Sequence, residues 1–192
     1  MNEYADQAIN SVLNSDLGFC KFLSANDTGA TGGHQSGILI SKSAVKMLFT
    51  QQQLEKDTIP KRIVKIKWQG DIITESCFTY YESKNELRIT RFGRGFPFIK
   101  PDQTGALFVF TKQSEVDYSG YFLETEEDIE AFLNAFVISP TETNSLIDTE
   151  KVQPETYEKT EIQEFINELK VDLIHETPTS ISGGSLYLLR WG

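Results

Sequence analysis

The sequence predicts a mainly β domain with flanking α-helices, an α+β arrangement in which short strands build a barrel-like sheet. The middle of the chain contains many short apolar or alternating segments bounded by turn residues, helical spacing is confined to a few segments, and no segment repeats. The expected strands cover residues 19–23, 37–40, 62–68, 72–81, 87–92, 105–111 and 118–123, with a further strand-like segment at 185–191. The expected helices cover residues 3–13, 43–54, 125–137 and 160–171.

The helical segments carry apolar faces and capping residues. Residues 3–13 place apolar side chains three or four positions apart, and polar residues end this pattern at 14–16. Ser41, Thr125 and Thr160 each precede a helical segment, where a hydroxyl can accept hydrogen bonds from the first free backbone N–H groups. These signals place helices on either side of the strand-rich region.

The strand signals alternate with polar segments. Residues 62–68 alternate charged and apolar side chains, which is typical of a strand with one buried face. Residues 24–35 are too polar and too rich in glycine for a helix or a strand. We expect a long ordered loop there, and such loops are often functional. Residues 139–153 are also polar and are expected to connect elements.

Composition argues against several classes of protein. The chain has 192 residues, 39% of them hydrophobic, and no apolar run reaches the ~20 residues of a membrane span. The first residues lack the basic start and apolar stretch of a signal peptide, so we expect a soluble protein that is not exported. Cys20 and Cys77 are expected to be buried free thiols. With only His34 and His175 to add, we expect no metal site and no cofactor.

The charge is distributed unevenly. The net charge of −10 argues against nucleic acid as a partner, because phosphate backbones attract basic proteins. However, residues 1–112 contain 14 Lys and Arg against 11 Asp and Glu, a net charge of +3, whereas residues 113–192 contain 4 against 17, a net charge of −13. The first region is therefore compatible with a DNA partner.

The loop at 24–35 has the chemistry of a binding loop. Its glycines allow backbone N–H groups to approach a ligand, and Asn26, Asp27 and His34 add side chains that donate and accept. It lacks the Gly-Lys-Ser/Thr ending of a phosphate-binding P-loop, which argues against a nucleoside triphosphate site. An ordinary surface loop is the alternative.

A second polar segment, residues 85–96, combines arginines with one acid. In an extended chain Glu86, Arg88 and Thr90 share one face, while the residues between them face the other way. Arg88 and Arg94 have planar guanidinium groups that can bind O6 and N7 of guanine together, and Glu86 can accept from N4 of cytosine. The alternative is a set of exposed ion pairs on a hairpin.

Two other motifs carry less weight. Residues 94–101 approximate the RNA-recognition-motif signature, but Pro97 would interrupt a central strand. Asp71, Glu82 and Lys84 approximate the acidic pair and lysine of magnesium-dependent nucleases. Such spacing arises often by chance in a charged chain.

Two blocks of sequence together resemble one family. Residues 23–35, Leu-Ser-Ala-Asn-Asp-Thr-Gly-Ala-Thr-Gly-Gly-His-Gln, are similar to part of the N-terminal DNA-binding (effector) domain of EcoRII-type restriction endonucleases. A second block in the same order contains Asn-Glu at 85–86, Arg-Ile-Thr-Arg at 88–91, Gly-Arg-Gly at 93–95 and Thr-Gly-Ala-Leu at 104–107. The resemblance covers residues 18–110, and agreement in two collinear blocks is specific.

The resemblance implies a fold and a target. The fold is a seven-stranded DNA-binding pseudobarrel, which we expect within residues 1–140. From the charge distribution we expect residues 141–192 to form an acidic C-terminal extension packed on or completing the same domain. An N-terminal arm, residues 21–35, and a C-terminal arm, residues 84–95, grip the major groove of double-stranded DNA at a short CCWGG-type site.

The resemblance also implies roles for individual side chains. The residues expected to read bases are His34, Glu86, Arg88, Arg91, Arg94, Asp27 and Gln35. The residues expected to contact the DNA backbone are Lys21, Ser24, Asn26, Thr28, Thr31, Lys84 and Thr90. Leu87 and Phe92 stand where the family has lysine and tryptophan, so one cationic contact is expected to be missing.

The leading hypothesis is a non-catalytic, sequence-specific domain that regulates or tethers a separate nuclease domain of a type II restriction endonuclease. Mg²⁺ is then expected only in the parent nuclease, and the domain is expected to be a monomer in the bacterial cytoplasm, without a membrane partner. Two alternatives stay open. One is a magnesium-dependent nuclease that uses Asp71, Glu82 and Lys84, and the other is a regulator that binds DNA without a nuclease partner.

Overall fold

The computed structural model describes most of the first of two compact units, which covers residues 1–152. The described residues are 3–32, 37–56, 59–84 and 86–149. The elements expected at 160–171 and 185–191 lie outside the described residues, as does most of the expected acidic extension.

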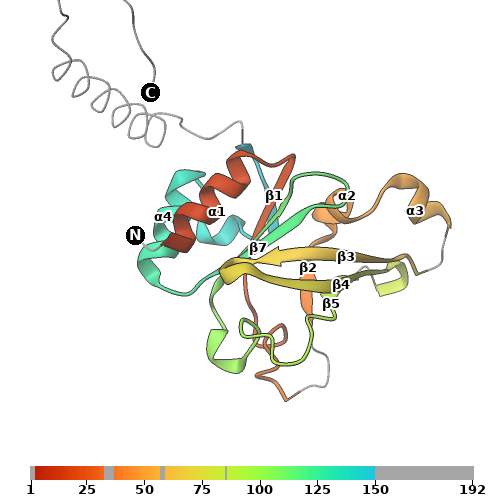
Figure 1. The fold of residues 1–192 in the computed structure, drawn as a ribbon, viewed down its shortest axis with the longest axis horizontal. Helices are drawn as coiled ribbons and strands as arrows, with labels where there is room; N and C mark the ends of the chain where they lie inside the picture. The colour runs from red at the N-terminus through yellow and green to blue at the C-terminus, as the bar shows by residue number, and fades with distance from the viewer. Residues whose placement is uncertain (1–2, 33–36, 57–58, 85, 150–192) are drawn as a thin grey trace, which may run out of the picture. The chain divides into compact units, whose positions relative to one another are not determined.

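Eight strands form one sheet in the described part of the chain (Figure 1). Neighbouring strands follow the order β2-β5-β4-β3-β7-β6-β1-β8, and β3 with β7 is the parallel pair among otherwise antiparallel neighbours. The strands are β1 (Leu17–Phe22), β2 (Ile38–Ile40), β3 (Lys61–Trp68), β4 (Ile72–Tyr81), β5 (Glu86–Thr90), β6 (Leu107–Lys112), β7 (Tyr118–Leu123) and β8 (Ser145–Ile147). The mainly β expectation is confirmed.

The eighth strand, β8, was not expected from the sequence. It pairs with β1 through Gly18 and Ile147 and through Cys20 and Ser145. It has three residues and follows a turn at Asn144, where φ is +64°. So short a segment shows too little alternation to be recognised, and residues 139–153 therefore looked like a connection. The expected number of seven strands is wrong, and the sheet continues beyond residue 140.

The sheet curves around one hydrophobic core. Phe19 of β1 and Ile38 of β2 belong to the same buried cluster, although six strand-to-strand steps separate β1 from β2 in the sheet. In a flat sheet these steps would hold the two strands about 29 Å apart. The sheet therefore bends into a half-barrel, with Trp68 packed against the rings of Phe110 and Phe122 inside it.

Two helices pack against each other and beside the sheet. α1 (Glu3–Leu13) buries Ala5, Ala8, Ile9 and Val12 and contacts α4, β6 and β7 (Figure 1). α4 (Glu126–Ala135) begins after Thr125, whose hydroxyl accepts a hydrogen bond from the backbone N–H of Asp128 at 3.2 Å. Both helices confirm the sequence-based expectation.

The helix expected over residues 43–54 is interrupted. The observed elements are η1 (Lys42–Ala44), α2 (Val45–Leu48) and α3 (Gln51–Lys56). Phe49 lies between the two α-helices in an extended conformation and is buried in the core. The backbone N–H of Thr50 donates to Gln53 Oε1 at 2.9 Å, and the backbone N–H of Gln53 donates to Thr50 Oγ1 at 3.4 Å. This reciprocal pair is a capping box that starts a new helix.

Two further expectations concern single features of the fold. Within the described ranges, no helix has the length and apolar character needed to cross a bilayer. Cys20 and Cys77 are free and buried, as expected. Burial raises the pKa of the Cys20 thiol to about 12, so this thiol stays protonated and unreactive at neutral pH.

Candidate nucleic-acid interface

The outward face of β5 carries three of the residues expected to contact DNA. Leu87 and Ile89 are fully buried in the core, and Glu86, Arg88 and Thr90 alternate with them and face outward. The alternation in the sequence predicted this arrangement correctly. Leu87 points into the core, so its side chain forms no part of the outward face. The expected absence of a cationic contact at this position stays a prediction.

Neighbouring strands extend this face. Leu39 of β2 and Thr79 of β4 are the residues paired with Arg88 on either side of β5. We call the side of the sheet that carries Leu39, Thr79, Glu86, Arg88 and Thr90 the recognition face; Thr79 is only 4% exposed, so the other four residues form its accessible surface. Arg88 lies at its centre.

Arg88 and Glu86 form an ion pair on the recognition face. Nη2 and Nε of Arg88 lie 3.2 and 3.3 Å from Oε2 of Glu86. Their side chains are 13% and 33% exposed, so the pair is partly shielded but open to a ligand. It presents guanidinium donors beside carboxylate acceptors, which is the combination that the major-groove edge of a G·C pair requires.

One end of the recognition face is formed by the β4–β5 turn. This turn contains η3 (Glu82–Lys84) and places the exposed Lys84 just before β5 begins. At the other end of β5, Ile89 pairs with Ile38, the residue at which the N-terminal arm enters β2. Loops therefore flank the recognition face at both ends of β5 (Figure 1).

The expected C-terminal arm, residues 84–95, is not one loop. β5 runs through it, so Lys84 lies at one end of this strand and Arg91 and Arg94 lie beyond the other. The loop that follows β5 packs beside the N-terminal arm. The N–H of Leu23 donates to the carbonyl of Ala106, and the N–H of Gly105 donates to the carbonyl of Leu23, both at 2.9 Å. Arg91 and Arg94 therefore belong with the N-terminal arm.

Lys21 and Asp27 are buried beneath the N-terminal arm. Nζ of Lys21 lies 2.7 Å from Oδ2 of Asp27, and the two residues are 6% and 0% exposed. Burial by itself would raise the pKa of the Asp27 carboxyl, but the Lys21 ammonium and hydrogen bonds from Lys21, Ser24 and Leu39 hold it below its ordinary value. Neither side chain can reach DNA in this structure, which corrects the expectation that both contact it.

Among the other described residues of the arm, Thr28 and Ser24 bond within the protein, whereas Asn26 and Thr31 are exposed. Thr28 is buried, with its hydroxyl 2.7 Å from that of Thr104, so the expected DNA contact of Thr28 is also corrected. Ser24 donates its hydroxyl to Asp27 at 2.6 Å. Asn26 and Thr31 are exposed, as a contact to DNA requires. His34 and Gln35 lie outside the described residues.

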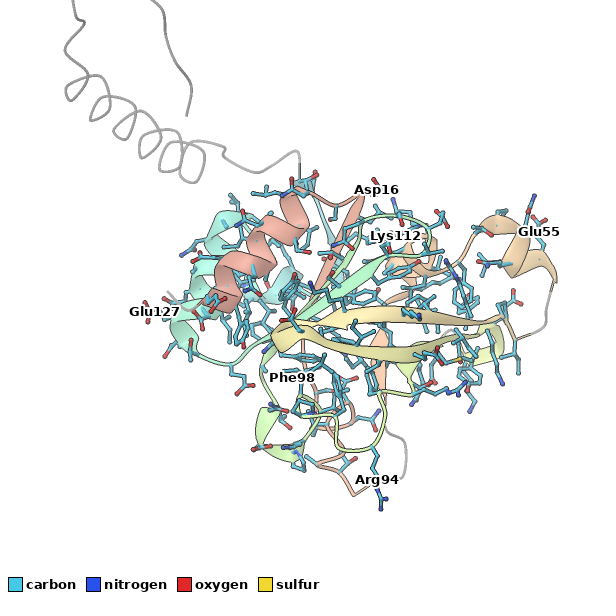
Figure 2. The ribbon with its side chains drawn as sticks, in the orientation of Figure 1. Asp16, Glu55, Arg94, Phe98, Lys112 and Glu127 are labelled. Carbon is cyan, nitrogen blue, oxygen red and sulfur yellow. The ribbon has the colours of Figure 1, made fainter. Side chains whose placement is uncertain are left out.

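Aromatic packing anchors the loop that carries Arg94. The rings of Phe92 and Phe96 stack with their centroids 5.1 Å apart, and both pack on Trp68. Arg94 lies between them on an exposed turn, with Gly93 and Gly95 at positive φ, and its side chain points away from the domain (Figure 2). The anchored turn holds a guanidinium group out in solvent.

Thr90 is constrained on the recognition face. Its hydroxyl donates to the carbonyl of Cys77 at 3.3 Å, so it must give up this bond to donate to a phosphate. Arg91 is exposed and adopts a positive φ of 64° at the end of β5. This conformation turns the chain away from the strand and toward the anchored turn.

Comparison with known proteins identifies the family. The model of the family described as restriction endonuclease EcoRII, N-terminal, matches residues 13–151. The chain belongs to this EcoRII N-terminal family. The type II restriction enzyme EcoRII of Escherichia coli is 36% identical over 97 residues, covering 46% of this chain and 24% of that enzyme. The resemblance seen in two sequence blocks is thus confirmed.

Among solved structures, the chain is similar to the UbaLAI restriction endonuclease B3 domain with cognate DNA. Its TM-score to this chain is 0.48 at 19% sequence identity, and the match covers 76% of this chain and 98% of that domain.

The alternative nuclease site does not form in this member of the EcoRII N-terminal family. Asp71 lies in the turn before β4 and pairs with Lys67 at 3.6 Å. Glu82 and Lys84 follow the other end of β4, a strand of ten residues that spans about 33 Å. The three side chains cannot share one magnesium ion, so the alternative based on them is wrong.

Two features of the interface were not predicted from the sequence. The backbone of Leu39 binds the buried Lys21 and Asp27, and no sequence pattern indicates such a contact. Lys61 of β3 is exposed and pairs with Thr79, so it continues the recognition face by one strand. Extending the alternation of residues 62–68 by one position would have found it.

Proposed function

We propose that this chain is a sequence-specific, non-catalytic domain that binds double-stranded DNA and belongs to a type II restriction endonuclease. The observation that carries the proposal is the recognition face, where Glu86 and Arg88 face solvent between loops at both ends of β5. Membership of the EcoRII N-terminal family supports it. The target that fits this family is a short site of the CCWGG type.

The recognition face suits the major groove in size. β5 has five residues and is therefore about 17 Å long. The major groove of B-DNA is about 12 Å wide and admits a two-stranded β-ribbon. β2 and β5 enter the groove, and the loops at both ends of β5 reach the phosphates on either side.

Base reading rests on the paired side chains at the centre. Arg88 donates to O6 and N7 of a guanine, and Glu86 accepts from N4 of a cytosine. Because Arg88 already bonds Glu86, the pair is oriented before DNA arrives, and less side-chain entropy is lost on binding. His34 and Gln35 remain predicted base readers.

Backbone contacts come from both ends of β5. Lys84 contacts phosphates at the β4–β5 turn, and Asn26 and Thr31 contact them from the N-terminal arm. Arg91 and Arg94 act beside this arm, at the edge of the groove, where a guanidinium group can bind either a base edge or a phosphate.

The remaining part of the proposal concerns the parent enzyme. The match to EcoRII covers 24% of that enzyme, which leaves room for a nuclease in a separate domain. Our domain regulates or tethers this nuclease, and Mg²⁺ binds there. The domain acts as a monomer on DNA in the bacterial cytoplasm.

Titration of labelled duplexes in the presence of Mg²⁺ tests the proposal. We expect the chain to bind a CCWGG duplex at least about 1,000-fold more tightly than a scrambled duplex, and to leave both intact. Equal affinity for the two duplexes would refute sequence-specific binding. Specific cleavage by this chain would refute the non-catalytic role.

A substitution of Lys84 tests the proposed backbone contact. Lys84→Ala should weaken binding to both duplexes equally and lower the slope of log K against log salt by about 1. Lys67→Ala is the matched control, because Lys67 is an exposed lysine of β3 that pairs with Ile73, near the end of β4 farthest from Lys84. An unchanged slope for Lys84→Ala would show that Lys84 does not contact a phosphate.

A further inference from the structure

The half-barrel has an open seam between β1 and β2. β2 lies at one edge of the sheet, and six strand-to-strand steps along the sheet separate it from β1. The curvature of the sheet nevertheless brings the two strands close enough for a lysine of β1 to hydrogen-bond the backbone of β2. At this seam the free edge of β2 needs partners for its backbone groups.

Side chains supply the partners for the central residue of β2. Lys21 Nζ donates to the carbonyl oxygen of Leu39 at 2.8 Å, and the N–H of Leu39 donates to Asp27 Oδ1 at 2.7 Å. Both backbone groups of Leu39 that face away from β5 are thus satisfied, much as a neighbouring strand would satisfy them. Lys21 and Asp27 bind each other at 2.7 Å, which completes a three-membered network.

This network joins the root of the N-terminal arm to the recognition face. Lys21 comes from β1, and Asp27 comes from the arm, where its Oδ2 also accepts from the backbone N–H of Ser24 at 2.8 Å. Leu39 is the residue paired with Arg88 on β5. Leu39 therefore connects the arm, through Asp27, to the strand pair that carries Arg88.

We propose that Lys21, Asp27 and the Leu39 backbone form a latch that positions the N-terminal arm against the recognition face, so that Lys21 and Asp27 determine DNA discrimination without contacting DNA. This inference rests on the proposed DNA-binding function. Lys21 and Asp27 are positioning residues.

The latch explains why a buried ion pair is present at this seam. Taking both charges out of water is costly, and apolar replacements of such pairs are often neutral or stabilising, so stability alone is a weak reason for the pair. An apolar pair could not bond the N–H and carbonyl of Leu39. The ion pair instead serves to hold the arm and β2 in a fixed relative position.

A second buried lysine provides a matched control. Lys112 of β6 is 9% exposed at its side chain, against 7% for Lys21, and its Nζ lies 2.6 Å from Glu115 Oε1. Lys112 pairs with Leu17, at the end of β1 opposite the N-terminal arm. In Figure 2 it lies on the opposite side of the domain from Arg94.

The experiment compares Lys21→Met with Lys112→Met in two measurements. The first is the thermal unfolding midpoint, which should fall by roughly 6–20 °C in Lys21→Met, because Asp27 is left buried without its partner. It should fall less in Lys112→Met, because the partner Glu115 is 64% exposed. The second is the ratio of affinities for CCWGG and scrambled duplexes, measured well below both midpoints. We expect this ratio to fall about tenfold or more in Lys21→Met and to stay within about twofold of the wild type in Lys112→Met.

Substitutions of Asp27 provide a second, independent comparison. Asp27→Asn keeps an oxygen that can accept from the Leu39 N–H, whereas Asp27→Ala does not. We therefore expect Asp27→Asn to retain more discrimination than Asp27→Ala. If Lys21→Met does not fold, this pair of variants decides the question.

Two results would overturn the latch while leaving the proposed function intact. One is a wild-type affinity ratio in Lys21→Met, or in Asp27→Ala if Lys21→Met does not fold. The other is an equal loss of discrimination in Lys21→Met and Lys112→Met. If the wild-type chain itself does not discriminate between the duplexes, the proposed function fails, and the latch fails with it.

Discussion

Gly120→Ala should destabilise the domain through a clash with Trp68. A Cβ at position 120 would lie 2.3 Å from Cζ3 and 2.5 Å from Cε3 of Trp68, whereas ordinary carbon contacts begin near 3.4 Å. The indole ring must therefore move by about 1 Å. It has little room, because it is 1% exposed and packs on Phe92 and Phe96.

The expected cost follows from these contacts. Overpacking a core costs about 1–3 kcal/mol. Movement of the ring also strains the hydrogen bond from Trp68 Nε1 to Thr74 Oγ1, now 2.8 Å long, which adds about 1 kcal/mol. A total of about 2–4 kcal/mol lowers the unfolding midpoint of a domain of this size by about 4–16 °C.

Thermal unfolding followed by circular dichroism measures this shift. Gly93→Ala is the control, because it is also a glycine-to-alanine change but no atom lies within 4 Å of the added Cβ. Its cost comes only from placing alanine at a φ of +88°. That conformation costs about 1–2 kcal/mol, or about 2–8 °C. A midpoint for Gly120→Ala at or above that of Gly93→Ala would refute the reasoning.

Three further predictions concern the interface. Arg88→Ala should cost about 1–3 kcal/mol of binding and lose discrimination at one base pair, measured by dissociation constants for single-substituted duplexes; an equal loss on every duplex would make Arg88 a phosphate contact. Gly37→Ala should reduce both the stability of the domain and its DNA affinity, because the added Cβ would lie 2.8 Å from Thr90 Cγ2 and 2.9 Å from the carbonyl oxygen of Ile89. Unfolding and DNA titration measure the two effects, and unchanged values would show that the arm can shift freely. Folding lowers the pKa of Asp27, so the stabilisation by its carboxylate is complete above about pH 3.8 and is lost as pH falls through the lower folded-state pKa. The advantage of the wild type over Asp27→Asn in urea unfolding should therefore shrink below about pH 3.8. A constant advantage would argue against a stabilising charge on Asp27.

Local patterns predicted much of the sheet. Period-2 alternation located the long strands, and it also placed Glu86 and Arg88 on one outward face, because side chains of a strand alternate whatever surrounds it. β8 was missed because three residues provide no period to detect. The interrupted helix was missed because apolar spacing continued across Phe49, whereas the capping box at Thr50 and Gln53 decided where the second helix begins.

The candidate site was less predictable than the fold. Lys21 and Asp27 look like surface residues in the sequence, since charged side chains are rarely buried without partners. Their partner is the backbone of Leu39, which becomes available only when the curvature of the sheet brings β2 near β1. The position of Arg94 depended similarly on tertiary packing, because Phe92 and Phe96 fix its turn to Trp68.

Both edges of the open sheet are protected against association with another chain. An unpaired strand edge is a template for aggregation. On the β2 side, the free backbone groups of Leu39 are already bonded, and on the other side the three-residue β8 covers β1. A fragment that ends at residue 140 would remove β8 and expose β1, whose sequence Leu-Gly-Phe-Cys-Lys-Phe is mostly apolar. A soluble recombinant form of the domain should therefore extend past Ile147.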